Sequence, residues 1–143
     1  MYMITGGCHC GNNSYLAEFT IDPAEYIARL CDCNFCSSHG AAYASDSKGK
    51  LVINIKKQSE ISKYRQGSRL VDFIICKTCG VLTNVVYKGN NNIYASINIR
   101  TADEYSAFGK GKVAHLAQLT DEERIKRWES AWFHNVELKC ERS

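Results

Sequence analysis

The chain has 143 residues, of which 45% are hydrophobic and 23% are charged, and its formal net charge is +3. This length and balance are typical of one globular domain over residues 1–143 and exclude a largely disordered chain. No apolar run approaches the length of a membrane span, and the N-terminus lacks the basic flank and long apolar stretch of a secretory signal. We therefore expect a cytoplasmic protein, in which thiols stay reduced.

Alternating apolar residues and β-branched runs predict a chain that is mainly β. We expect strands over residues 1–5, 14–21, 41–44, 51–55, 61–64, 69–75, 81–87 and 93–99, with a loop over residues 37–40. In the segment 14–21, Tyr15, Ala17 and Phe19 share one face of the strand, as alternate residues do. Gly89 and the three asparagines after it predict the hairpin turn between the last two strands.

Short helices are predicted near both ends of the chain. Asp22 is suited to cap a helix that begins at Pro23, because proline fits the first helical position. This helix would be short, since only a few residues separate it from the next cysteine group. Near the C-terminus, Thr120 and Glu123 have the spacing of a capping box, which predicts a helix that runs to about Trp132.

Eight cysteines are the main chemical signal of the sequence. They occur as Cys8-His9-Cys10, as Cys31-Asp32-Cys33-Asn34-Phe35-Cys36, as Cys76-Lys77-Thr78-Cys79 and as the isolated Cys140. In a reducing compartment this spacing favours metal ligands over disulfides or free core thiols. The first and third groups are each followed by a glycine, Gly11 and Gly80, which lets the backbone turn so that amide N–H groups can point at the sulfurs.

We expect these cysteines to build two zinc sites of different character. The four-cysteine cluster consists of Cys8, Cys10, Cys76 and Cys79, and four thiolates are typical of a closed, structural zinc site. The cysteine triplet consists of Cys31, Cys33 and Cys36, and three protein ligands with one open position are typical of a catalytic zinc. The open position could hold water, hydroxide or a substrate thiol, and a thiol bound there would lose its proton at neutral pH.

Two alternatives to this grouping stay open. One of the first two triplet cysteines could pair with the Cys76–Cys79 turn instead. Cys140 could also complete the second site as a fourth ligand, although it lies near the end of the chain. Zinc binding would also change the net charge of the protein. Seven thiolates and two Zn²⁺ ions would bring the formal net charge from +3 to about zero. The basic balance is therefore weak evidence for a nucleic-acid partner.

Several motifs in this order resemble the glutathione-dependent formaldehyde-activating enzyme family. They are Gly6-Gly7-Cys8-His9-Cys10-Gly11, Cys31-x-Cys33-x-x-Cys36 with Gly40 after it, Tyr64-Arg65-Gln66-Gly67-Ser68, Cys76-Lys77-Thr78-Cys79-Gly80 and Ile97-Asn98-Ile99-Arg100 with Asp103 after it. The resemblance covers roughly residues 6–105. It implies a β-tent fold of antiparallel sheets around zinc, with a structural zinc on the four-cysteine cluster and a second zinc on the triplet.

The same resemblance implies a carbon–sulfur lyase, similar to S-(hydroxymethyl)glutathione synthase, that joins the thiol of glutathione to formaldehyde. The expected partners are thus a small thiol and a small aldehyde, and neither a membrane nor a nucleic acid. His39 follows the triplet closely and could transfer a proton, or it could be a loop histidine with no role. Arg65, Arg69 and Arg100 are candidates to bind the carboxylates of glutathione, because each lies in or beside a motif segment.

Two other functions fit a zinc-stabilised scaffold. Related β-tent proteins such as centromere protein V suggest a non-enzymatic module that binds protein or nucleic acid. Nucleic-acid binding needs a basic surface with interleaved aromatic residues, whereas the basic clusters Lys56-Lys57 and Lys110-x-Lys112 are small. Redox chemistry or metal buffering by the triplet ranks last, because zinc-bound cysteines are poor redox pairs until the metal leaves.

Overall fold

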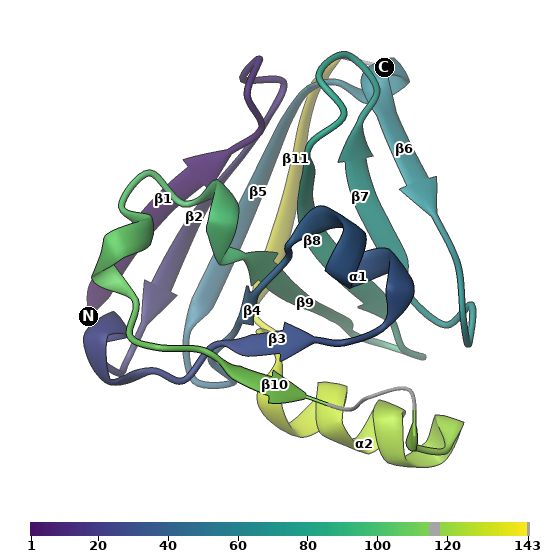
Figure 1. Ribbon diagram of the computed structural model, residues 1–143. Helices are drawn as coiled ribbons and strands as arrows, with labels where there is room; N and C mark the ends of the chain where they lie inside the picture. Colours follow the sequence, from purple (N-terminus) through teal and green to yellow (C-terminus); the bar gives the residue numbers. More distant parts are fainter. Residues whose placement is uncertain (115–117, 143) are drawn as a thin grey trace.

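Two β-sheets form most of the protein and converge toward one end, like the sides of a tent (Figure 1). The structure is a computed structural model that describes residues 1–114 and 118–142. In these residues the first sheet has four strands in the order β1-β2-β5-β11, namely β1 (Tyr2–Gly7), β2 (Asn13–Phe19), β5 (Lys50–Lys57) and β11 (Val136–Arg142). The predicted mainly-β class is confirmed.

The second sheet has seven strands in the order β10-β3-β4-β9-β8-β7-β6 within the described part of the chain. Their bounds are β3 (Arg29–Cys31), β4 (Tyr43–Ala44), β6 (Ile61–Tyr64), β7 (Asp72–Cys76), β8 (Leu82–Lys88), β9 (Ile93–Asn98) and β10 (Lys112–Ala114). Both sheets are mixed, which differs from the antiparallel sheets that the resemblance implied. The strand β11 pairs in parallel with β5, and β10 pairs in parallel with β3, while the other pairings are antiparallel.

The helices that the structure describes are short. They are α1 (Asn34–His39), α2 (Asp121–Ala131) and the 3₁₀ helices Pro23–Glu25, Gln58–Glu60, Ile99–Thr101 and Tyr105–Ala107. The predicted cap at Asp22 is present, since its carboxylate accepts a hydrogen bond of 2.9 Å from the Ala24 N–H. The capping box at the start of α2 is also present, with Thr120 as the cap. Of the described residues, none forms a helix long and apolar enough to cross a membrane.

The predicted loop over residues 37–40 is wrong, because these residues belong to α1 and its C-cap. Cys33 caps the N-terminus of this helix, and its sulfur accepts a hydrogen bond of 3.4 Å from the Cys36 N–H. Gly40 ends the helix at φ +61°, a left-handed conformation that glycine adopts without steric cost. Two of the three triplet cysteines are therefore held by a turn of helix.

The strand predicted from residue 69 begins later, at Asp72, because Arg69 has a positive φ of 60° that breaks the extended backbone. Three strands were not predicted at all, namely β3, β10 and β11. Of these, β3 matters most for the site, since it ends at Cys31.

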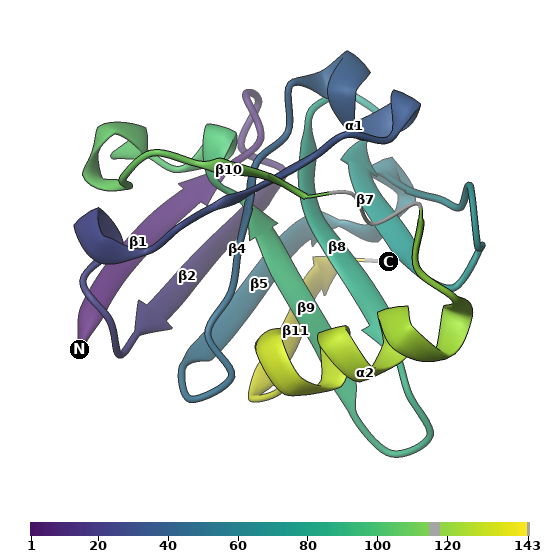
Figure 2. The same cartoon turned by 60° about the horizontal axis from the view of Figure 1, so that its bottom comes forward.

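The main apolar core fills the space between the two sheets. Phe19 and Phe133 are completely buried at its centre, with ring centroids 5.3 Å apart. On β2, the predicted face of Tyr15, Ala17 and Phe19 is indeed the buried one. A second apolar cluster lies beneath α2, which crosses the wide end of the second sheet (Figure 2). This second cluster positions the cavity described below.

Candidate metal centres and cavity

The four-cysteine cluster is assembled from two turns that belong to different sheets. Cys8 and Cys10 lie in the turn between β1 and β2, while Cys76 is the last residue of β7 and Cys79 lies in the turn that leads to β8. All four Sγ atoms lie within 4.8 Å of one another. The Cys8–Cys10 and Cys10–Cys76 Sγ distances are 3.7 and 3.5 Å.

These sulfur spacings fit a tetrahedral zinc site. With a Zn–S bond of about 2.3 Å, a regular tetrahedron places its sulfurs about 3.8 Å apart. The same spacings do not fit disulfides, in which the two sulfurs are bonded at about 2.05 Å. The cluster as a whole therefore has the donor set and the separation that a zinc ion requires.

The backbone turns at the two cysteine pairs of this cluster depend on glycine, as the positions of Gly11 and Gly80 in the sequence predicted. Gly11 has φ +86° and Gly80 has φ +78°, so each turn uses a conformation that other residues rarely adopt. The Asn13 N–H donates to Cys8 Sγ over 3.3 Å. Although burial raises the pKa of Cys79, hydrogen bonds from the Cys10 and Val81 backbone N–H groups lower it to about 6. The thiolate form that binds metal is thus favoured at neutral pH.

The cysteine triplet comes from the junction of β3 and α1. Cys31 is the last residue of β3, Cys33 caps α1, and Cys36 lies in the first turn of that helix. Their Sγ atoms lie within 4.8 Å of one another. The Tyr43 hydroxyl lies 3.2 Å from Cys36 Sγ, within hydrogen-bond distance. The triplet thus offers three sulfurs from one short segment.

Hydrogen bonding within the triplet shifts the pKa values of two of its thiols in opposite directions. A hydrogen bond from the Cys36 thiol lowers the pKa of Cys31 to about 6. The same hydrogen bond, together with burial, raises the pKa of Cys36. Burial also raises the pKa of Tyr43, so its hydroxyl stays protonated. One thiolate is therefore already favoured here, and three sulfurs with a neighbouring hydroxyl suit a sulfur-binding ion such as zinc.

A cavity of about 490 Å³ opens beside the triplet. Its lining residues come from β3, β4, the segment between β6 and β7, β8 and α2, and they are Arg29, Cys31, Asp32, Cys33, Asn34, Cys36, Tyr43, Gln66, Gly67, Ser68, Val71, Phe73, Val85, Gln118, Arg124, Trp128 and Trp132. The four-cysteine cluster contributes no residue to this lining. Of the two cysteine clusters, the triplet is therefore the one that lines this cavity.

Two groups in the cavity wall were not predicted from the sequence. Gln66, from the segment between β6 and β7, places Nε2 3.9 Å from Cys33 Sγ. Arg29 lies on β3, two residues before Cys31, where burial lowers the pKa of its guanidinium below the ordinary value. The alternation of side chains along a strand would have indicated Arg29, but β3 itself was not predicted.

The remaining candidates lie elsewhere. Cys140 is on β11, where its thiol donates to Gln58 Oε1 over 2.9 Å, and it joins neither cluster. The alternative in which the triplet pairs with the Cys76–Cys79 turn is likewise not the grouping that the structure has. His39 is exposed, packs against Phe35 with ring centroids 4.6 Å apart and an angle of 51° between the rings, and does not line the cavity.

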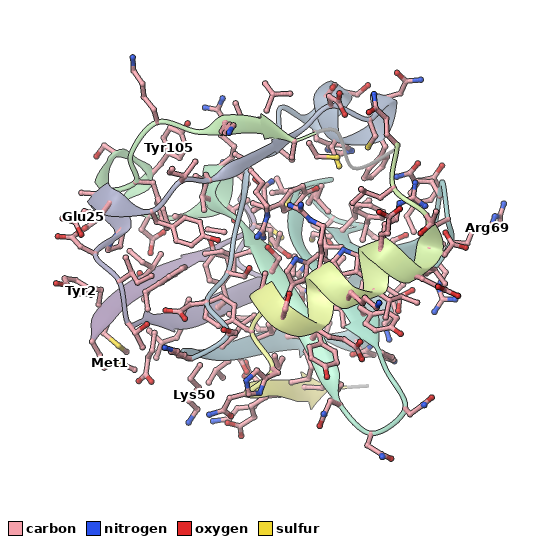
Figure 3. All side chains as sticks on the ribbon, turned by 90° about the horizontal axis from the view of Figure 1, so that it is seen from below. Met1, Tyr2, Glu25, Lys50, Arg69 and Tyr105 are labelled. Atoms are coloured by element: carbon pink, nitrogen blue, oxygen red, sulfur yellow. The ribbon has the colours of Figure 1, made fainter. Side chains whose placement is uncertain are left out.

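None of the three arginines proposed for carboxylate binding lines the cavity. Arg65 forms an ion pair of 2.6 Å with Asp72. Arg100 donates to the Gly40 carbonyl over 3.1 Å and lies over the ring of Tyr105. Arg69 extends outward from the edge of the molecule, as Figure 3 shows. Proximity to a motif in the chain therefore did not place these side chains in the cavity lining.

The chain is similar to known proteins in both sequence and structure. A comparison with curated proteins gives no significant match. The crystal structure of a Rhodobacter sphaeroides protein, a structural genomics target, is similar at 25% identity and a TM-score of 0.52, over 76% of this chain and 99% of that chain. The sequence profile of the family described as glutathione-dependent formaldehyde-activating enzyme matches residues 3–117, which include both cysteine clusters and end before α2. The chain therefore belongs to the glutathione-dependent formaldehyde-activating enzyme family.

Proposed function

We propose that this protein is a zinc enzyme that adds a thiol to a small aldehyde, with glutathione and formaldehyde as the first pair to test. In this proposal the four-cysteine cluster holds a structural zinc, and the triplet holds a catalytic one. The observation that carries the proposal is the position of the triplet in the wall of a cavity of about 490 Å³. The four-cysteine cluster has a full set of four sulfurs and contributes no residue to the lining of this cavity, which supports a structural role.

A zinc ion held by Cys31, Cys33 and Cys36 would supply a Lewis-acidic open position that favours a thiolate over a thiol. The groups of the chain around it would position the reactants. The protonated Tyr43 hydroxyl can donate to sulfur, since it already lies 3.2 Å from Cys36 Sγ. The Gln66 amide can donate to an oxygen that becomes negatively charged next to Cys33.

The reaction balances without an oxidant or reductant. The thiol loses its proton, and a lone pair of the resulting thiolate forms a bond to the carbonyl carbon of the aldehyde. The π electrons of the C=O bond move to oxygen, which takes up one proton. The product is a hydroxymethyl thioether when the aldehyde is formaldehyde, and the reverse reaction breaks the same carbon–sulfur bond. This is the chemistry of a carbon–sulfur lyase.

The experiment that tests the proposal measures exchange between formaldehyde and thiols by NMR. The purified, zinc-loaded protein is compared with Cys33→Ser, using glutathione and several smaller thiols, and the rate of the uncatalysed reaction is subtracted. We expect Cys33→Ser to fall to the uncatalysed rate, because the triplet then has only two sulfurs. The substrate pair with the largest difference identifies the preferred thiol.

Cys140→Ser is the matched control, since Cys140 lies in neither cluster. It should keep the rate and the metal content of the wild-type protein. Circular dichroism and zinc analysis of both variants separate loss of the site from loss of the fold. Equal rates for wild type and Cys33→Ser, with Cys33→Ser folded, would remove the catalytic role of the triplet.

A further inference from the structure

Arg29 brings a positive charge to the cavity wall that the proposed zinc chemistry does not use. Its side chain is partly buried, and Nη2 donates to the Ser45 and Ser96 hydroxyls over 3.0 and 3.3 Å. Both acceptors are neutral, and each hydroxyl donates onward to a backbone carbonyl. Among the residues that the structure describes, no carboxylate forms an ion pair with Arg29. A cation away from bulk water without an anionic partner is unfavourable unless a ligand supplies the anion.

Strand geometry directs this cation to the same side as the triplet. Arg29 and Cys31 are two residues apart on β3, so their side chains share one face of the sheet. Tyr43 lies directly opposite Arg29 on β4, and its hydroxyl contacts Cys36. The Cα atoms of residues two apart along a strand are separated by about 6.6 Å. A small molecule in the cavity could therefore reach both the guanidinium and the triplet.

Another part of the cavity wall is aromatic and comes from α2. Trp128 and Trp132 both line the cavity, with ring centroids 5.4 Å apart and an angle of 33° between the rings. Tyr87 packs on Trp128 with ring centroids 5.1 Å apart, which fixes the orientation of that indole. A flat apolar group is the ligand that such a wall favours. This wall lies outside residues 3–117, the part of the chain that matches the family.

The aromatic wall and the cation are held together by one hydrogen-bonded chain. Arg29 donates to the Ser45 hydroxyl, and the Ser45 hydroxyl donates over 3.0 Å to the carbonyl of Ala131, the last residue of α2. Trp132 follows directly. The end of α2 is thus fixed relative to the guanidinium, so the two features form one binding surface. Arg124 does not serve as the anion-binding group in this scheme, because it is paired with Asp121 at 3.1 Å.

We propose that the cavity selects a substrate that carries both a carboxylate and a flat aromatic group. The carboxylate would bind Arg29, and the aromatic ring would lie against Trp128 and Trp132. This inference rests on the proposed function only for the statement that the bound molecule is a substrate. It extends that function from glutathione to aromatic acids that bear a thiol or an aldehyde.

Phenylacetate tests the binding surface by itself, since it has the carboxylate and the ring but neither a thiol nor an aldehyde. Benzyl alcohol lacks the charge, and propionate lacks the ring. The chain has only two tryptophans, and both lie in the cavity wall, so tryptophan fluorescence reports on this surface directly. We expect phenylacetate to change the fluorescence and to bind at least about tenfold more tightly than either analogue, as charged hydrogen bonds permit. Calorimetry checks the same affinities.

Arg29→Gln should lose about tenfold or more of the phenylacetate affinity and keep the weaker binding of benzyl alcohol. Arg69→Gln is the matched control, since Arg69 lies outside the cavity lining, and it should bind like the wild type. Equal affinities for the three probes, no binding of phenylacetate, or an unaffected Arg29→Gln variant would each overturn the inference. If binding behaves as expected while turnover does not depend on Cys33, the proposed function fails and the binding surface stands.

Discussion

Replacing Cys76 by serine should destabilise the whole fold, because the proposed structural zinc would join two sheets that are far apart in sequence. Cys10 and Cys76 are 66 residues apart, and their sulfurs lie 3.5 Å from each other. Treated as a cross-link, a closed loop of this length lowers the entropy of the denatured chain by roughly 15 cal/mol/K, or about 4.4 kcal/mol at 25 °C. A typical domain is stable by only about 5–15 kcal/mol, so the loss is a large share of the total.

Urea denaturation followed by tryptophan fluorescence measures this loss. With a slope near 2 kcal/mol/M, the midpoint should fall by about 2 M in Cys76→Ser. Zinc analysis should show one metal ion fewer per chain. Cys140→Ser is the control, since it removes a thiol that belongs to neither cluster and should change neither quantity.

If Cys76→Ser does not fold, a second measurement on the wild-type protein tests the same prediction. A chelator should lower the urea midpoint of the wild-type protein by a similar amount, since it removes the same cross-link. The reasoning is refuted if Cys76→Ser matches Cys140→Ser in midpoint and metal content. It is also refuted if the chelator strips the metal and leaves the midpoint unchanged.

Two further predictions concern the surroundings of the site. Thr120→Ala should reduce the free energy of unfolding by about 1 kcal/mol, and the thermal midpoint by about 3–5 °C, because it removes the hydrogen bond of 3.2 Å from the Glu123 N–H. Asp46→Asn tests acid stability: burial raises the pKa of Asp46, but hydrogen bonds from Thr20 and the Lys48 N–H hold it below its ordinary value. The wild type should exceed Asp46→Asn by about 1.5–3 kcal/mol at pH 7, and urea midpoints should show this difference shrinking as the pH falls below about 3.9.

The sign of the second prediction follows from the depressed pKa in the folded state. Asp46 contributes its stabilisation while it is ionised, so the contribution is present above the unfolded pKa and is lost as the pH falls through the folded one. A difference that grows toward acid pH would contradict this. For the helix cap, Ser130→Ala is the control: the exposed Ser130 hydroxyl donates to the Arg127 carbonyl within the helix, and its removal should shift the midpoint little. An unchanged midpoint in Thr120→Ala would show that the cap is dispensable.

The cysteine clusters and most strands could be predicted from sequence because their determinants are local. Gly80 after the Cys76–Cys79 turn indicates a backbone turn that other residues rarely adopt. The runs 51–55 and 93–99 are rich in β-branched and apolar residues, which favour strands. By contrast, α1 could not be predicted by periodicity, because it has only six residues and is capped by a cysteine instead of a common capping residue. For β11, an alternating pattern at Val136, Leu138 and Cys140 was present and could have been used.

The cavity could not be predicted because it depends on which strands are neighbours. Arg65 and Arg100 lie beside motifs in the chain, yet their side chains are engaged by Asp72 and by Gly40. Arg29 lies in no motif, and it reaches the cavity because β3 pairs with β4 and carries Cys31 on the same face. A helix that runs to about Trp132 was predicted, but only the structure shows that Trp128 and Trp132 pack near the triplet and line its cavity.

The topology also explains why the two clusters differ in ligand number. Eight cysteines could form two sets of four, and Cys140 is the residue that would complete the second set. Instead, β11 carries it to the edge of the first sheet, where it pairs with Ile55 and bonds to Gln58. The triplet comes from β3 and α1, has three sulfurs among the residues that the structure describes, and lines the cavity. In the proposed function, a thiol brought by a small molecule would take the fourth position on a zinc ion held by these three sulfurs.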